Sequence, residues 1–241
     1  MSTQFWAGLW NGRKPAGDTH LRSREVLSPS GGIMRGKFPS RKNGRMVHHE
    51  GLLELDAIYL FEASPAIDGY REQPTQIPYP DGDRVRRYTP DFEVRLIDGR
   101  VVLIEVKPTA ALASAETAHK LARIADHMHR SGQPFVVLTE QVLRREPRQS
   151  NIRTICHRAP RVLPSPRLAR IALERCIAQL PTTLSEATRH FAQHDIDLYS
   201  LLMMGLLRCP LEKEPIGPAT CITSTTEAND GWFWLSEEHG L

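Results

Sequence analysis

Long apolar runs are missing from this sequence of 241 residues, and none approaches the length of a membrane span. We therefore expect no transmembrane helix. Residues 1–6 lack the pattern of a secretory signal, so we expect none. Cysteine is also scarce, and the four that occur, Cys156, Cys176, Cys209 and Cys221, include no C-x-x-C pair. Their spacing argues against a zinc site or a disulfide framework and predicts free thiols in a reducing compartment.

A strong net charge is also absent, because the formal total is only +3, but the charges are unevenly distributed. Residues 1–49 contain nine Lys and Arg residues, Arg41 and Lys42 among them, against two acidic residues. After Cys209 the balance reverses, with six acidic residues and one lysine. This asymmetry indicates a nucleic acid near one end of the chain and another partner, such as a protein, near the other.

Residues 1–45 are rich in Gly, Ser, Pro and Arg and show little periodicity. We interpret them as a basic N-terminal arm. Such an arm can lie along a DNA backbone and neutralise phosphates, which would give Arg41 and Lys42 a DNA contact. It can equally be a solvated leader without a fixed partner, and both readings stay open.

The most informative stretch runs from Arg86 to Pro108. Apolar residues mostly alternate with polar ones over 92–97, which is typical of a strand. Asp98-Gly99 is a strong two-residue hairpin signal. Residues 101–106 form a nearly unbroken apolar run, as in a strand buried on both faces, and Pro108 ends it. The stretch therefore predicts a β-hairpin.

This hairpin would bring Asp91, at the start of its first strand, back near position 105 or 106. Glu105 and Lys107 lie at the end of the second strand on one face. A carboxylate in so apolar a strand is costly to desolvate without compensation, and a divalent cation such as magnesium or manganese would supply it. The carbonyl of Val106 is a candidate further ligand. The alternative is a surface hairpin with a solvated Glu-Lys pair, which the preceding apolar run disfavours.

The pair Pro90-Asp91, followed by Glu105-x-Lys107, resembles the PD-(D/E)xK nuclease signature. Four blocks in order are similar to the TnsA family, the transposon-end endonucleases of heteromeric cut-and-paste transposons. These blocks are residues 48–56 (HHEGLLELD), 70–74 (YREQP), 89–92 (TPDF) and 104–108 (IEVKP). The resemblance covers about residues 46–140 and rests on element order alone beyond about 160.

The resemblance implies an α/β fold with a restriction-endonuclease-like core, in which helices flank a mixed central sheet. We place this nuclease domain at 46–160 and a small winged-helix-like domain at 161–241. The apolar pattern of 49–63 predicts a helix that Pro65 ends. Only the resemblance selects Glu54 from this helix as an acid that supports metal binding, with Glu50 as the alternative. Lys107 would orient or deprotonate the attacking water, or only stabilise charge.

Several basic residues are candidates for DNA contacts. Arg84, Arg86 and Arg87 lie just before Asp91, so they could approach the same phosphates as the metal, or form a solvated strand edge. Lys120 lies on the polar side of a helix expected over 110–131. A buried strand is expected at 134–139, and an edge strand at 151–157.

A Pro-rich joint at 158–167 separates the expected domains. Helices are expected at 167–179, 183–190 and 196–208, followed by strand-like pieces at 220–224 and 232–235. This order fits a winged-helix module. The third helix is nearly all apolar, whereas a recognition helix should show Arg, Lys, Asn or Gln, so we expect it to contact protein rather than bases.

The sequence thus predicts a DNA endonuclease dependent on Mg²⁺, for which Mn²⁺ can substitute. The resemblance implies that it cuts one strand at each transposon end, while a DDE transposase (TnsB-like) cuts and joins the other under an AAA+ ATPase (TnsC-like). We expect a bacterial cytoplasmic protein associated with the nucleoid. The alternatives are a stand-alone restriction or resolvase-type endonuclease and an inactive DNA-binding adaptor.

Overall fold

The computed structural model describes residues 35–225, which form two compact units. Of the described residues, 35–62 and 67–144 belong to the first unit, and 63–66 and 145–225 to the second. Our expected domain boundary at 160/161 lies later in the chain than this division. In the described part, no helix has the length and apolarity to span a membrane.

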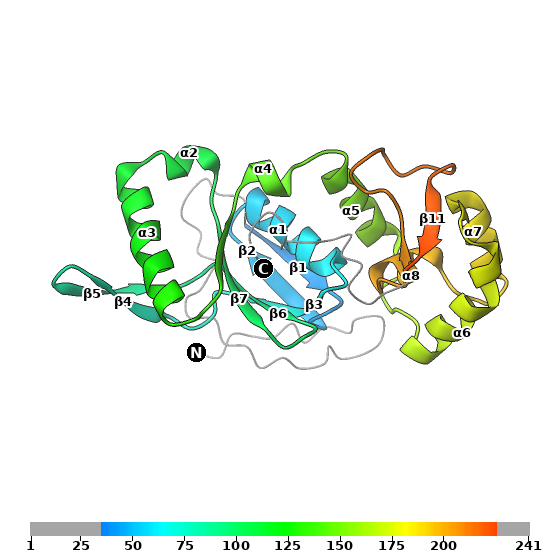
Figure 1. Ribbon diagram of the computed structural model, residues 1–241, viewed down its shortest axis with the longest axis horizontal. Helices are drawn as coiled ribbons and strands as arrows, with labels where there is room; N and C mark the ends of the chain where they lie inside the picture. The colour runs from blue at the N-terminus through cyan, green and yellow to red at the C-terminus, as the bar shows by residue number, and fades with distance from the viewer. Residues whose placement is uncertain (1–34, 226–241) are drawn as a thin grey trace. The chain divides into compact units, whose positions relative to one another are not determined.

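The first unit is built on a four-stranded sheet with the order β3-β6-β7-β8 (Figure 1). Its strands are β3 (Ile67–Glu72), β6 (Phe92–Leu96), β7 (Val101–Val106) and β8 (Phe135–Leu138). The β3–β6 and β6–β7 pairs are antiparallel and the β7–β8 pair is parallel. The hairpin predicted at Asp98-Gly99 is confirmed, and Gly99 has a φ of 88°, which glycine adopts without strain.

Helices pack on the two faces of this sheet. The register pairs Phe92 with Ile104, so these side chains share one face, where Phe61 of α1 (Leu52–Ala63) lies 5.3 Å from the Phe92 ring centroid. The neighbouring residue Leu103 points to the other face and packs with α3 (Ala115–Arg130). This mixed sheet flanked by helices is the predicted restriction-endonuclease-like fold, which is confirmed.

The single helix expected over 110–131 is divided, and that prediction is wrong in this detail. The chain forms the short helix α2 (Thr109–Leu112) and then α3. Ser114 separates them because its hydroxyl accepts from the backbone N–H of Thr117 as an N-cap. Three buried residues, Leu121, Ile124 and Met128, then face the sheet at helical spacing.

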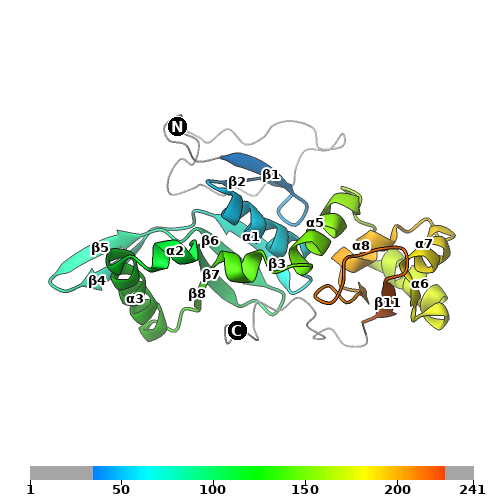
Figure 2. The same ribbon diagram turned by 90° about the horizontal axis from the view of Figure 1, so that it is seen from above.

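A two-stranded ribbon, β4 (Ile77–Asp81) and β5 (Arg84–Tyr88), extends alongside α3 (Figure 2). Tyr79 and Tyr88 lie on one face and join the buried cluster of Leu103 and the α3 residues. Val85 points the other way and is 75% exposed. The ribbon therefore has one face anchored on α3 and one open to solvent.

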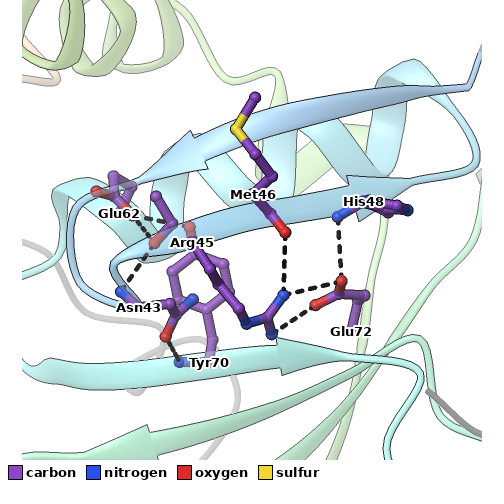
Figure 3. A network of polar contacts seen from close by, with 8 residues as sticks. Asn43, Arg45, Met46, His48, Glu62, Tyr70 and Glu72 are labelled. Atoms are coloured by element: carbon purple, nitrogen blue, oxygen red, sulfur yellow. Dashed lines mark hydrogen bonds and ion pairs between the residues drawn. The ribbon is translucent and has the colours of Figure 1, made fainter. Parts of the chain in front are cut away.

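Residues 36–45, expected within an arm of little periodicity, instead form most of a β-hairpin. Its strands are β1 (Gly36–Ser40) and β2 (Arg45–His49). A buried ion pair attaches it to β3, because Arg45 makes contacts of 2.8 and 3.0 Å to the two carboxylate oxygens of Glu72 (Figure 3). The sequence periodicity of residues 36–45 does not predict this contact, because Arg45 and Glu72 lie far apart in the chain. The rest of the expected arm, residues 1–34, lies outside the described residues.

The prediction of an edge strand at 151–157 is wrong, because this segment lies in helix α5 (Arg148–Arg158) of the second unit. Ile152, Ile155 and Cys156 are buried at helical spacing, which overrides the strand preference of the isoleucines. Asn151 is also buried, and its side-chain amide donates to the carbonyls of Leu211 and Glu214. The first unit ends with the short helix α4 (Glu140–Leu143).

The second unit continues with helices and a small sheet. Its remaining elements are α6 (Pro166–Cys176), a 3₁₀ turn (Ile177–Gln179), β9 (Thr182–Thr183), α7 (Leu184–Ala192), α8 (Leu198–Met203), β10 (Leu207–Arg208) and β11 (Cys221–Ser224). Helix α8 is shorter than the expected 196–208, and all of its residues are buried. The strand-like piece at 232–235 lies outside the described residues. The four cysteines are free thiols, as predicted.

Candidate active site

The two strands of the central hairpin place Asp91 opposite Glu105. Asp91 immediately precedes β6, and the pairing of Phe92 with Ile104 sets this register. The backbone N–H of Val106 donates to Asp91 Oδ2 at 2.8 Å, which fixes the carboxylate against the end of β7. Asp91 is 7% exposed and Glu105 is 2% exposed. Two carboxylates are thereby buried at one end of the sheet.

Lys107 lies between these carboxylates. Its Nζ is 2.7 Å from Glu105 Oε1 and 3.6 Å from Asp91 Oδ2, and it donates to the carbonyl of Val106 at 3.4 Å. The Lys107 backbone N–H donates to Leu138 O, which ties the residue to β8. The structure therefore brings Asp91, Glu105, Lys107 and the Val106 carbonyl together.

Burial and charge act in opposite ways on this cluster. Burial and the neighbouring Glu105 carboxylate raise the pKa of Asp91 to about 8, because together they outweigh the Lys107 ammonium. Burial lowers the pKa of Lys107, but the charges of Asp91 and Glu105 together raise it by more. The net shift of the Lys107 pKa is therefore upward. In the metal-free protein the two carboxylates therefore hold the ammonium protonated.

Glu54 belongs to the same electrostatic environment. It lies in the first turn of α1, where its Oε2 accepts from the backbone N–H of Glu50 at 2.7 Å. Its charge contributes to the raised pKa values of both Asp91 and Lys107. The alternative acid, Glu50, instead has its Oε1 4.0 Å from Arg35 Nε. The charge of Glu54 therefore acts on the site.

The donor set fits a hard divalent cation. The Asp91 and Glu105 carboxylates and the Val106 carbonyl are oxygen ligands of the kind that Mg²⁺ and Mn²⁺ prefer. Burial and the Glu105 carboxylate raise the pKa of Asp91, so a bound cation would stabilise its ionised form. Among the described residues, no group of three or more His, Cys, Asp and Glu side chains is arranged to hold an ion. Water and substrate oxygens would therefore complete the coordination, as is usual for Mg²⁺.

Tyr88 is a residue of this site that sequence reasoning missed. Its hydroxyl donates to Glu105 Oε2 at 2.5 Å, and Tyr88 is only 3% exposed. Burial and the adjacent Glu105 charge raise its pKa, so the phenol stays a hydrogen-bond donor. Tyr88 ends the β4–β5 ribbon, and only the tertiary position of that ribbon brings it to Glu105. No local motif signals this contact.

The predicted DNA-contacting residues fall into two groups. Arg84, Arg86 and Arg87 are exposed on β5, the strand that leads to Tyr88, and Arg86 Nε lies 2.6 Å from Asp81 Oδ2. Lys120 Nζ lies 5.6 Å from the centroid of the Tyr88 ring, beside the site. These four residues lie on elements that adjoin the carboxylates.

Arg41 and Lys42 belong to the other group, in the turn between β1 and β2. Lys42 Nζ donates to the carbonyl of Ile67 at 2.5 Å. Ile67 pairs with Leu96, at the end of β6 opposite to Asp91. The structure therefore does not bring Arg41 and Lys42 to the carboxylates.

The backbone of Gln73 also positions Asp91. Its N–H donates to Asp91 O at 2.9 Å, and its φ of 46° lies in the left-handed region that disfavours a Cβ. We expect Gln73→Ala to be about 1 kcal/mol less stable than Gln73→Gly, since both remove the side chain and only Ala retains the strain. Urea unfolding of the two variants measures this difference. Equal stabilities would contradict the left-handed conformation.

One comparison with known proteins bears on this site. Residues 64–140 match the family model described as TnsA-like endonuclease N terminal. The match includes Tyr88, Asp91, Glu105 and Lys107, and it begins after Glu54. It confirms the resemblance over the central sheet but does not extend to α5–α8. No curated protein matches the chain.

Proposed function

We propose that this chain, which carries a TnsA-like endonuclease domain at residues 64–140, is a metal-dependent nuclease that hydrolyses a DNA phosphodiester bond at transposon ends. The observation that carries the proposal is the buried pair Asp91 and Glu105, with Lys107 Nζ at 2.7 Å from Glu105. A buried acidic pair beside one lysine is suited to bind a cation and a phosphate together.

The chain's own residues would hold the metal and its substrate. Asp91, Glu105 and the Val106 carbonyl would hold Mg²⁺ or Mn²⁺, with Glu54 in support, directly or through water. When bound, the cation polarises the phosphate and stabilises charge on the leaving oxygen. The N–H of Val106 keeps Asp91 oriented. Lys107 would orient the attacking water or stabilise negative charge on the phosphate.

The basic residues beside the site would bind the DNA backbone. Arg84, Arg86 and Arg87 extend along the ribbon from Tyr88, and Lys120 lies over the Tyr88 ring. Lys and Arg contacts to phosphates position a duplex without reading its sequence. Choice of the cut site would then come from partners, which we propose to be a DDE transposase and an AAA+ ATPase. The likeness to TnsA supports this division of labour, with one strand cut by this chain.

Cleavage of supercoiled plasmid tests the proposed function. Wild-type protein is incubated with Mg²⁺, Mn²⁺ or EDTA, with and without the proposed transposase partner, and Glu105→Ala serves as the inactive control. We expect nicking that requires metal and is lost in the control, and stimulation by the transposase would support the role in transposition. Intact plasmid in every reaction, with DNA or partner binding retained, would instead favour the inactive adaptor.

A further inference from the structure

We propose that Tyr88 is a positioning residue that holds Glu105 in the orientation required for metal binding. The inference rests on the proposed function and extends it to a residue outside the Asp91, Glu105 and Lys107 motif. Tyr88 comes from the β4–β5 ribbon, so the proposal also makes this ribbon part of the metal site.

The two carboxylate oxygens of Glu105 contact different partners. Oε2 accepts from the Tyr88 hydroxyl at 2.5 Å, while Oε1 faces Lys107 Nζ at 2.7 Å. Lys107 Nζ in turn lies 3.6 Å from Asp91 Oδ2. Oε1 is therefore the oxygen presented to the space that Lys107 shares with Asp91, and the hydrogen bond from Tyr88 keeps the carboxylate from rotating.

The Tyr88 ring is itself held on several sides. It is 3% exposed and packs in the cluster that contains Leu103 and the buried residues of α3. The Phe135 ring of β8 meets it edge-on, with the centroids 6.0 Å apart. Lys120 Nζ lies over the ring at 5.6 Å from its centroid. A hydroxyl on so constrained a ring is a fixed donor rather than a mobile one.

A fixed single oxygen has a consequence for metal choice. Mg²⁺ requires near-ideal octahedral geometry, so it tolerates a rotating or bidentate carboxylate poorly. Loss of a hydrogen bond that orients a metal ligand typically weakens metal binding about 10- to 100-fold. Without the hydroxyl, the Glu105 carboxylate is no longer held in one orientation. The affinity for Mg²⁺ should therefore fall more than the affinity for Mn²⁺.

Tyr88→Phe tests the proposal, because it removes the hydroxyl and retains the ring. The matched control is Tyr79→Phe, which removes the hydroxyl of a second buried tyrosine in the same ribbon and cluster. Tyr79 pairs in register with Arg86, away from Glu105. Binding of Mn²⁺ is measured by electron paramagnetic resonance on the full chain without DNA, and Mg²⁺ binding by its competition with Mn²⁺. Thermal unfolding checks that each variant is folded.

We expect Tyr88→Phe to bind Mn²⁺ about 10-fold more weakly than wild type, with a larger loss for Mg²⁺ and no change in Tyr79→Phe. Equal Mn²⁺ affinities of wild type and Tyr88→Phe would overturn the positioning role of Tyr88 but not the proposed nuclease function. Equal weakening in both variants would overturn it too, since packing would then explain the loss. Absence of Mn²⁺ binding by the wild type would overturn the proposed metal dependence and this inference with it.

Discussion

Asp91→Asn should abolish metal-dependent cleavage and at the same time make the metal-free protein more stable. The asparagine oxygen can still accept from the Val106 N–H, but the negative charge that binds a cation is gone. We expect a loss of cleavage on the order of 1000-fold. The gain in stability has a separate cause, which is the cost of burying a second carboxylate beside Glu105.

The gain in stability of Asp91→Asn over the wild type should depend on pH. Burial and Glu105 raise the pKa of Asp91 from 3.8 to about 8 in the folded protein. The folded state therefore favours the protonated acid, so this stabilising contribution is complete below pH 3.8 and is lost as the pH rises through 8. Asparagine does not titrate, so the variant escapes this loss. We expect it to be more stable than wild type by several kcal/mol at pH 8, because one pKa unit corresponds to about 1.4 kcal/mol, and by less at lower pH.

Urea unfolding of wild type and Asp91→Asn between pH 5 and pH 9, with EDTA or with Mg²⁺, measures both effects. Added Mg²⁺ should stabilise the wild type and leave the variant unchanged, because binding to the folded state alone adds stability. Asp98→Asn, at the exposed turn of the same hairpin, is the control, and it should retain cleavage. A metal-free Asp91→Asn protein that is less stable than wild type at pH 8 would contradict the prediction.

The second large effect concerns Glu62, which is 0% exposed and holds the β1–β2 turn onto the core (Figure 3). Its Oε2 accepts from Ser40 Oγ and Tyr70 OH, each at 2.8 Å, and its Oε1 accepts from the backbone N–H of Arg41 at 2.6 Å. Glu62→Ala leaves these donors buried without their acceptor. We expect a loss of about 3–5 kcal/mol in the free energy of unfolding.

Tyr70→Phe is the matched control for Glu62→Ala, because it removes one donor and retains the acceptor. It should lower the free energy of unfolding by about 1 kcal/mol. Glu62→Gln should fall between the two, since its amide group offers one accepting oxygen in place of two. Urea unfolding in the absence of metal compares the three variants. A Glu62→Ala protein within 1 kcal/mol of wild type would show that the hairpin is not anchored through this carboxylate.

Local sequence patterns were enough to predict the central hairpin and the residues that it brings together. Asp98-Gly99 sets the turn, and side chains alternate along both strands, so Asp91, Glu105 and Lys107 meet through contacts that are local in the chain. The mixed sheet and its flanking helices also followed from the sequence, through apolar periodicity and through a resemblance that the family match confirms over 64–140.

Contacts between distant segments, which local patterns do not predict, complete the site. Tyr88 reaches Glu105 because the ribbon packs on α3, and the charge of Glu54, on α1, acts on Asp91. Residues 151–157 form a helix because burial of Ile152 and Ile155 outweighs their strand preference. Each of these outcomes depends on packing between segments far apart in sequence, and local patterns carry no information about such packing.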